Sequence, residues 1–158
     1  MKHLFIVRHG VYHKEGLDLT PRGIAQIQKL AKEMKAITGG ISRGHYLVSS
    51  SARRAEQSAQ IIADAFGLKS FETKKNLWTN SWDDFYPELL NEIDEIVESH
   101  RDTHEIMTLV THYEVVNSYP SYASKWLIGR EEKIRKILKG RAVHFNLENR
   151  TYQIIPNR

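Results

Sequence analysis

Short apolar segments rich in β-branched and aromatic residues alternate along this chain with longer segments of helical periodicity. The apolar segments predict strands, at Leu4–Val7, Tyr46–Val48, Ile106–Val110, Val143–Leu147 and Tyr152–Ile155, with a weaker candidate at Phe71–Lys75. Strands that alternate with helices favour a mostly parallel sheet covered on both faces. The sequence therefore predicts an α/β fold, a three-layer α/β/α sandwich formed by one domain over residues 1–158.

The first helix is expected to begin at Thr20-Pro21, where threonine can cap and proline fits the first turn. Its apolar face is expected to hold Ile24, Ile27, Leu30, Ala31 and Met34, and Gly39-Gly40 to end it. Further helices are predicted at Ala52–Phe66, at Pro87–His100, at Tyr113–Leu127 with an interruption at Pro120, and at Glu131–Leu138. Four residues separate the last two strands, which predicts a hairpin and an antiparallel edge.

Composition limits the chemistry and the partners of the chain. Its 158 residues include no cysteine, which excludes a disulfide, a thiolate nucleophile and a cysteine-ligated metal. The net charge is +4, but basic and acidic residues are interspersed, as in Glu131–Lys136, which favours a mixed surface over a nucleic-acid-binding stripe. Neither a signal-peptide pattern nor a segment of membrane-spanning length occurs. We therefore expect a cytoplasmic protein with no nucleic-acid and no membrane partner.

Reactive residues follow three of the predicted strands. Arg8-His9-Gly10 ends the first strand, Ser49–Ala55 with its two arginines follows the second, and His112 follows the strand that ends in Val110-Thr111. Ligands of open α/β sheets bind beyond the carboxyl ends of the strands. Two imidazoles and at least two guanidiniums are therefore expected to converge on one crevice, which suits the binding and attack of a phosphate group.

These segments, together with Leu19–Gly23 before the first helix, resemble the histidine phosphatase superfamily, which contains phosphoglycerate mutases and phosphohistidine phosphatases. The resemblance implies that His9 is the nucleophile that becomes phosphorylated. It also implies that Arg8, Arg54 and His112 bind the phosphoryl group. In the family pattern the arginine directly precedes alanine and stands four residues before serine or threonine, which selects Arg54 over Arg53.

The residue types also fit phosphoryl transfer on physical grounds. Guanidiniums stabilise the charge on the transferring group, so no metal ion and no cofactor is expected. The same cations disfavour protonation of His9, whose other ring nitrogen is expected to donate to a backbone carbonyl. His112 is expected to donate a hydrogen bond to a phosphoryl oxygen, and Gly10 to allow a close approach of the backbone. A zinc site at His100 and His104 is disfavoured, because Arg101 stands where a metalloprotease motif has its glutamate.

The leaving group needs a proton unless its own pKa is low. Many members of the resembled family place a glutamate after the third strand, but the segment from Trp78 to Glu88 lacks the surrounding pattern. Asp83 is the first candidate for the acid and Asp84 the second. A good leaving group such as imidazole weakens the need for an acid, which keeps phosphohistidine hydrolysis open. Trp78 either lines the mouth of the pocket or covers the core.

Taken together, these features predict a metal-independent phosphatase that forms a phosphohistidine intermediate and hydrolyses a phosphomonoester or a phosphohistidine. Its partner would be a small phosphorylated substrate or a phosphoprotein. One alternative is a phosphoglycerate-type mutase, although little more than thirty residues separate Arg54 from Pro87, whereas mutases of the family usually carry long insertions. Another is a non-catalytic phospho-ligand-binding or scaffold protein, favoured by Val11 and the missing acid. The sequence specifies neither the substrate nor the oligomeric state.

Overall fold

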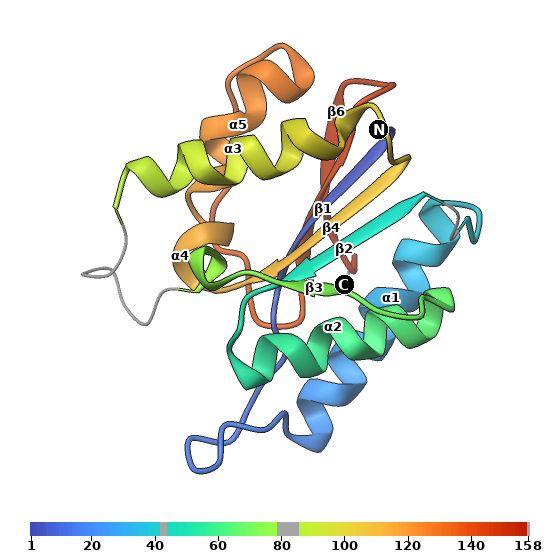
Figure 1. The fold of residues 1–158 in the computed structure, drawn as a ribbon, viewed down its shortest axis with the longest axis vertical. Coiled ribbons are helices and arrows are strands. Elements are labelled where there is room, and N and C mark those ends of the chain that lie inside the picture. Colours follow the sequence, from blue (N-terminus) through green and yellow to red (C-terminus); the bar gives the residue numbers. More distant parts are fainter. Residues whose placement is uncertain (42–43, 79–85, 158) are drawn as a thin grey trace.

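The computed structural model describes residues 1–41, 44–78 and 86–157 (Figure 1). Within them, six strands form one sheet in the order β3-β2-β4-β1-β5-β6. The bounds are β1 (His3–Arg8), β2 (His45–Ser49), β3 (Glu72–Thr73), β4 (Ile106–Thr111), β5 (Ala142–Asn146) and β6 (Thr151–Ile155). The first four strands pair in parallel, whereas β5 pairs antiparallel with both β1 and β6. The predicted mostly parallel sheet with an antiparallel edge is thus confirmed.

The burial of each strand follows from its place in the sheet. All residues of β4 are buried, and so are the four central residues of β1, because these strands are covered on both faces. By contrast, most residues of β6 at the edge are at least partly exposed. The weak strand candidate at Phe71–Lys75 is reduced to the two exposed residues of β3.

Helices cover both faces of the sheet, as Figure 1 shows. On one face, α1 (Pro21–Ile37) and α2 (Arg53–Phe66) pack on the side of β1 that bears Phe5 and Val7. On the other face, α3 (Glu88–Arg101), α4 (Tyr113–Val116) and α5 (Tyr119–Ile128) pack on the side that bears Leu4 and Ile6. A short 3-10 turn, η1 (Lys75–Leu77), follows β3. The three-layer α/β/α sandwich expected from the sequence is confirmed.

The expected apolar face of α1 needs one correction. Ile27, Leu30, Ala31 and Met34 are buried, but Ile24 is 39% exposed. The buried stripe begins instead at Gly23, which lies against the backbone of Val11. Thr20 caps this helix, because its side chain accepts a hydrogen bond from the amide of Gly23 at 3.0 Å.

The prediction of a single helix interrupted by Pro120 is also corrected. The break between α4 and α5 falls at residues 117–118, and Pro120 lies in the first turn of α5. A proline is tolerated there because the amides of a first helical turn have no partner within the helix.

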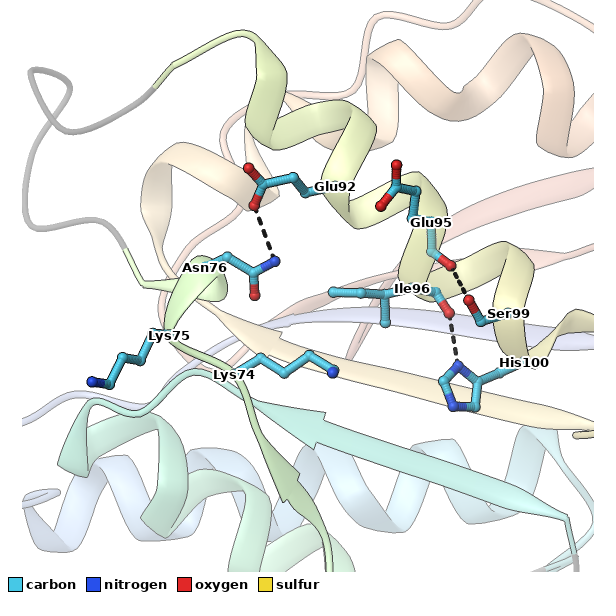
Figure 2. A pocket seen from close by; sticks show the side chains of 8 residues that line it. All are labelled: Lys74, Lys75, Asn76, Glu92, Glu95, Ile96, Ser99 and His100. Atoms are coloured by element: carbon cyan, nitrogen blue, oxygen red, sulfur yellow. Dashed lines mark hydrogen bonds between the residues drawn. The ribbon is translucent and has the colours of Figure 1, made fainter.

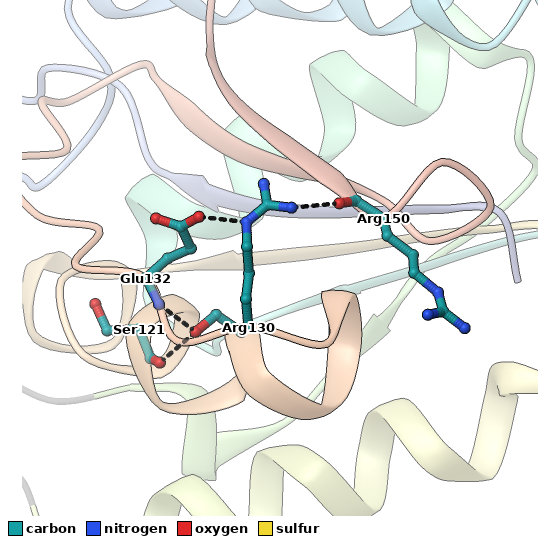
Figure 3. A network of polar contacts seen from close by, with 5 residues as sticks. Ser121, Arg130, Glu132 and Arg150 are labelled. Carbon is teal, nitrogen blue, oxygen red and sulfur yellow. Dashed lines mark hydrogen bonds and ion pairs between the residues drawn. The ribbon is translucent and has the colours of Figure 1, made fainter.

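The short helix predicted at Glu131–Leu138 is wrong, because this segment has no regular secondary structure. Its amides are bound by side chains rather than by its own carbonyls. The amide of Glu132 donates to Ser124 Oγ at 3.0 Å, that of Ile134 to Ser121 Oγ at 2.8 Å, and that of Ile137 to Asn117 Oδ1 at 3.0 Å. Figure 3 shows the start of the segment, where Arg130 donates to the carboxylate of Glu132 and to the carbonyl of Arg150.

Candidate active site

Three loops meet at the carboxyl ends of β1, β2 and β4. The chain leaves β1 and β2 toward the face covered by α1 and α2, whereas it leaves the adjacent β4 toward the face of α4 and α5. The two connections that follow β1 and β4 therefore diverge, and in open α/β sheets such a divergence leaves the crevice where ligands bind. His9 follows β1 and His112 follows β4, so both stand at this point.

His9 is held in one tautomer. Its ring is 3% exposed, and its Nδ1 lies 2.8 Å from the carbonyl oxygen of Gly10. Because a carbonyl can only accept, Nδ1 carries the proton and Nε2 keeps its lone pair. The backbone of His9 is fixed as well, since its amide donates to the carbonyl of Thr111 at 3.2 Å. The expected hydrogen bond from the second ring nitrogen to a backbone carbonyl is present.

Gly10 and Gly23 bring the loop after β1 against the start of α1. A Cβ on Gly10 would lie 2.7 Å from the carbonyl oxygen of Gly23, and a Cβ on Gly23 would lie 2.0 Å from that of Val11. The amide of Gly10 donates to Ser58 Oγ at 3.2 Å, and this hydroxyl donates to the carbonyl of Arg54 at 2.8 Å. Ser58 therefore joins the loop that carries His9 to the first turn of α2.

The guanidinium of Arg54 bridges the two imidazoles. Its Nε donates to His9 Nε2 at 3.2 Å, and its Nη2 lies 3.3 Å from His112 Nδ1. The two rings have their centroids 5.1 Å apart, and the arginine is only 8% exposed. The guanidinium also lies over the ring of Tyr12, 4.7 Å from its centroid. The structure thus brings together three of the residues that the sequence singles out.

His112 is oriented by a buried hydroxyl. Since Nδ1 accepts from Arg54, Nε2 carries the proton and donates to Ser50 Oγ at 2.7 Å. Trp78 stacks on the ring with centroids 6.4 Å apart, so this tryptophan lies at the site. Nδ1 is the nitrogen that faces Arg54 and His9. His112 can donate to a phosphoryl oxygen from that nitrogen only after it takes up a second proton.

Arg8 lies beside this cluster rather than in the bridge between the rings. Its Nη1 donates to the carbonyl of Ile137 at 2.9 Å, and its guanidinium lies over the ring of Tyr113 at 4.8 Å. Its Nε is buried and has no hydrogen-bond partner among the described residues. The structure therefore places Arg8 near the two imidazoles but directs part of its side chain to the segment before β5.

Burial and neighbouring cations keep both imidazoles neutral. Burial is the main cause that lowers the pKa of His9 to about 3, and the charges of Arg54, Arg8 and Lys139 add to it. The pKa of His112 is lowered to about 2, first by burial and then by His9, Arg54 and Arg8. At neutral pH the Nε2 lone pair of His9 is thus available to an electrophile.

Other residues considered from the sequence lie elsewhere. Arg53 is exposed and forms an ion pair with Asp18 on the surface, which agrees with the choice of Arg54. Asp83 and Asp84 lie outside the described residues, so the candidate acid has no structural account. His100 packs face to face on Tyr46 at 3.6 Å and donates from Nδ1 to the carbonyl of Ile96. Among the described residues, no three side chains of His, Asp or Glu gather in a group that could hold a metal ion.

Three neighbours of the site were not identified from the sequence as functional. Ser50 orients His112, and Tyr12 packs on Arg54. Lys139 lies over the ring of Tyr12, with Nζ 4.7 Å from the ring centroid. Ser50 stands within the segment Ser49–Ala55 and could have been found from its place at the end of β2. Nothing in the local sequence marks Lys139, because its proximity arises from the pairing of β5 with β1.

The fold and this cluster define an α/β protein with a histidine–arginine–histidine site at the carboxyl ends of its central parallel strands. Residues 4–79, just under half of the chain, match the sequence model of the histidine phosphatase superfamily, branch 1. The comparisons with known structures extend the likeness to nearly the whole fold, and the resemblance to the histidine phosphatase superfamily is confirmed. No curated protein matches the chain in sequence. In the part of the chain that the structure describes, no helix has the length and apolar character needed to cross a bilayer.

Several solved structures share the fold at low sequence identity. The protein histidine phosphatase SixA in complex with tungstate has 15% identity and a TM-score of 0.70, with 96% of this chain and 93% of that chain covered. A SixA described as a putative phosphohistidine phosphatase, from Agrobacterium tumefaciens, has 14% identity and a TM-score of 0.63, with 98% and 95% covered. A mycobacterial glucosyl-3-phosphoglycerate phosphatase has 13% identity and a TM-score of 0.63, with 98% and 97% covered.

Proposed function

We propose that this protein is a phosphatase that hydrolyses a phosphomonoester or a phosphohistidine through a phosphohistidine formed at Nε2 of His9. The observation that carries the proposal is the bridge of Arg54 between His9 and His112, with the tautomer of His9 fixed by Gly10. One guanidinium and one available imidazole nitrogen then face the same small volume. This is the arrangement needed to hold a phosphoryl group and attack it.

The first step transfers the phosphoryl group to His9. Phosphoryl oxygens accept the hydrogen bonds that Arg54 otherwise donates to the two ring nitrogens, which frees the lone pair of His9 Nε2. Nε2 then bonds to phosphorus while the bond from phosphorus to the leaving atom breaks, and the leaving atom departs with the electron pair. It takes a proton from water or from an acid, for which Asp83 and Asp84 remain the candidates.

The second step returns His9 to its starting state. Water attacks phosphorus, the bond between phosphorus and Nε2 breaks, and the pair of electrons returns to the imidazole. The proton of the water passes to solvent, and inorganic phosphate is the product. In both steps the charge on the equatorial oxygens is stabilised by Arg54, by Arg8 nearby and by a protonated His112. A bound phosphoryl anion favours that protonation, because it adds a negative charge beside Nδ1.

Hydrolysis is proposed over a mutase reaction because the neighbours in the fold comparison include a protein histidine phosphatase and a glucosyl-3-phosphoglycerate phosphatase. The short chain between Arg54 and Pro87 agrees with this choice.

The test is the hydrolysis of an aryl phosphate in the presence of a metal chelator. The wild type is expected to release phosphate, and His9→Ala to lose turnover entirely, because the substitution removes the proposed nucleophile. His13→Ala, which changes an exposed histidine four residues away, is the matched control and should retain full activity. Acid-labile, alkali-stable phosphate bound to the wild type but not to His9→Ala would identify the intermediate.

Four results would contradict the proposal. Full activity of His9→Ala would show that His9 is not the nucleophile. Inhibition of the wild type by the chelator would indicate a mechanism that depends on a metal ion. Tight binding of phosphate or vanadate without turnover of any substrate would identify a non-catalytic phospho-ligand-binding protein. Isomerisation of phosphoglycerate without release of phosphate would identify a mutase.

A further inference from the structure

A hollow of about 560 Å³ lies next to the candidate active site and is lined by basic side chains. It is formed by α1, by the segment before β5 and by the end of the chain. Its charged lining residues are all cations: Arg8, Arg22, Lys29, Lys139 and Arg141. Among the residues that the structure describes, no carboxylate lines it. We refer to this set as the basic pocket.

Another pocket of similar size does not share this concentration of one charge. Figure 2 shows a hollow of about 600 Å³ between η1 and α3, whose lining does not include His9 or His112. Its lining holds Lys74 and Lys75 together with Glu92 and Glu95, and Asn76 donates to Glu92 at 3.1 Å. The positive and negative charges of this hollow are equal in number, as on an ordinary mixed surface. The basic pocket differs because its cations lack this compensation.

Four of the five cations of the basic pocket also lack an ion pair in the part of the chain that the structure describes, whereas Arg8 has the carboxylate of Glu114 nearby. Within the described residues, Arg22, Lys29, Lys139 and Arg141 take part in none of the ion pairs with carboxylates. Arg141 donates instead to the carbonyl of Pro156 at 2.9 Å. The pKa of Lys139 is lowered by burial and by the charges of Arg8, Arg54 and Lys14. These groups repel one another, and an anion placed among them would relieve the repulsion.

The basic pocket is joined rigidly to the loop that carries His9. The amide of Gly140 lies 3.1 Å from the carbonyl oxygen of Arg8 and 3.0 Å from that of His9. Gly140 has a φ of +74°, and a Cβ there would lie 2.6 Å from Cβ of Gln26, so a glycine fits this contact best. Lys139 and Arg141 flank this anchored residue. Arg8 lines the basic pocket and also lies close enough to lower the pKa of both imidazoles.

We propose that the basic pocket binds a second anionic group, a phosphate or a carboxylate, of a small-molecule substrate whose scissile phosphate lies at His9. The inference rests on the proposed function for the scissile phosphate but adds the class of substrate. A substrate with negative charge at both ends gains contacts that a simple phosphomonoester does not have. Charge-assisted hydrogen bonds of this kind change affinity by about tenfold each.

Two probes that differ in one anionic group test the substrate class. 3-Phosphoglycerate carries a carboxylate where glycerol 3-phosphate carries a hydroxymethyl group. We expect His9→Ala protein, which cannot turn either over, to bind 3-phosphoglycerate about tenfold more tightly in a calorimetric titration. The ratio of the two affinities should decrease as salt is added, because the charges of the basic pocket are partly exposed and salt screens them.

Two double variants test whether the preference for 3-phosphoglycerate arises in the basic pocket. Arg22→Gln with Lys29→Gln removes two exposed charges of the basic pocket, and is expected to reduce the preference for 3-phosphoglycerate about tenfold with little effect on glycerol 3-phosphate. Lys74→Gln with Lys75→Gln removes the same charge from the balanced pocket of Figure 2 and should leave the preference unchanged. An equal loss in both double variants would reduce the effect to net charge and overturn the inference.

The remaining outcomes separate this inference from the proposed function. Equal affinity for the two probes overturns the basic pocket as a subsite, even if the wild type hydrolyses both. A binding preference that persists while the wild type hydrolyses nothing keeps the subsite and overturns the phosphatase. Failure of both probes to bind to a protein whose wild type hydrolyses the aryl phosphate overturns this inference and leaves the proposed function standing. An acidic phosphopeptide that binds more tightly than either probe would assign the pocket to a macromolecule and overturn the small-molecule class.

Discussion

Arg54 makes two contacts that no other cation of the site makes, one with each imidazole. Its planar fork presents both N–H groups from one rigid group, which the single ammonium of lysine cannot reproduce. Arg54→Ala is therefore expected to lower kcat/KM for an aryl phosphate by about 10²–10³-fold, through the loss of transition-state stabilisation. Arg54→Lys is expected to recover only a small part of this loss. Steady-state kinetics of the purified variants measures both effects.

Arg53 supplies the matched control for that prediction. It is the neighbouring arginine on the same turn of α2, but its side chain pairs with Asp18 on the surface. Arg53→Ala is expected to keep kcat/KM within a small factor of the wild type. If Arg53→Ala is the more damaging of the two, the assignment of the phosphoryl-binding arginine is wrong.

The sequence indicates some residues of the site much better than others. His9, Arg54 and His112 each follow a strand of a recognisable parallel sheet, so the fold brings them together wherever the loops run. Tyr12 and Lys139 are different. Tyr12 contacts both Arg54 and Lys139, and these contacts depend on how the segment before β5 meets the loop after β1. Such a contact between distant loops leaves no periodic pattern. For the acid, Asp83 and Asp84 remain predictions.

At the level of elements, the contact between the loop after β1 and α1 sets the position of His9. It depends on Gly23, whose added Cβ would lie 2.0 Å from the carbonyl oxygen of Val11. Gly23→Ala must therefore move the loop or the helix, which is expected to cost about 1–3 kcal/mol of stability. The same shift displaces His9 from Arg54, so kcat/KM should fall as well. Urea unfolding and hydrolysis of an aryl phosphate measure the two effects.

Gly39→Ala separates loss of stability from loss of alignment. Gly39 lies beyond the other end of α1, has a φ of +66° and has no atom near its hypothetical Cβ. The substitution is expected to lower stability through backbone strain alone. Its kcat/KM should remain near that of the wild type. Equal losses of activity in both variants would mean that Gly23 acts only through global stability.

The error in the helix predicted at Glu131–Leu138 has a physical cause. Ile134 and Ile137 are buried and stand three residues apart, a spacing that also occurs on a helix face. Their segment is not helical, because side chains of Ser121, Ser124 and Asn117 accept hydrogen bonds from its amides. Side-chain partners of this kind compete with helical hydrogen bonds, and a local pattern does not contain them. The long strands and helices were predictable because their apolar faces are repeated over many residues.

On the scale of the whole molecule, buried histidines couple stability to pH. The pKa values of His9, His112, His45 and His144 are lowered, mainly by burial, to about 3, 2, 4 and 4. In the unfolded chain each would titrate near 6.5, so below that pH the unfolded state binds protons that the folded state excludes. The free energy of unfolding is therefore expected to fall as the pH decreases from 6.5 toward 4, by up to about 1.4 kcal/mol per pH unit for each histidine.

Urea unfolding between pH 7.5 and pH 4.5 checks this expectation. His45→Gln removes one of the four groups without touching the candidate active site, since His45 contacts Thr108 and packs on Phe66. The variant should show a shallower loss of stability below pH 6.5 than the wild type. A stability that stays constant across this range, or an unchanged slope in the variant, would show that these imidazoles are protonated in the folded protein.

The amide of His9 is tied to the carbonyl of Thr111, between the two central strands of the sheet. Central strands are among the last parts of a protein to open, whereas peripheral loops open at low cost. A warmed sample would therefore not pass through a form that is folded but has lost the alignment of its reactive ring. Inactivation by heat and the melting of the sheet would be one event, read at the same temperature by an enzyme assay and by circular dichroism.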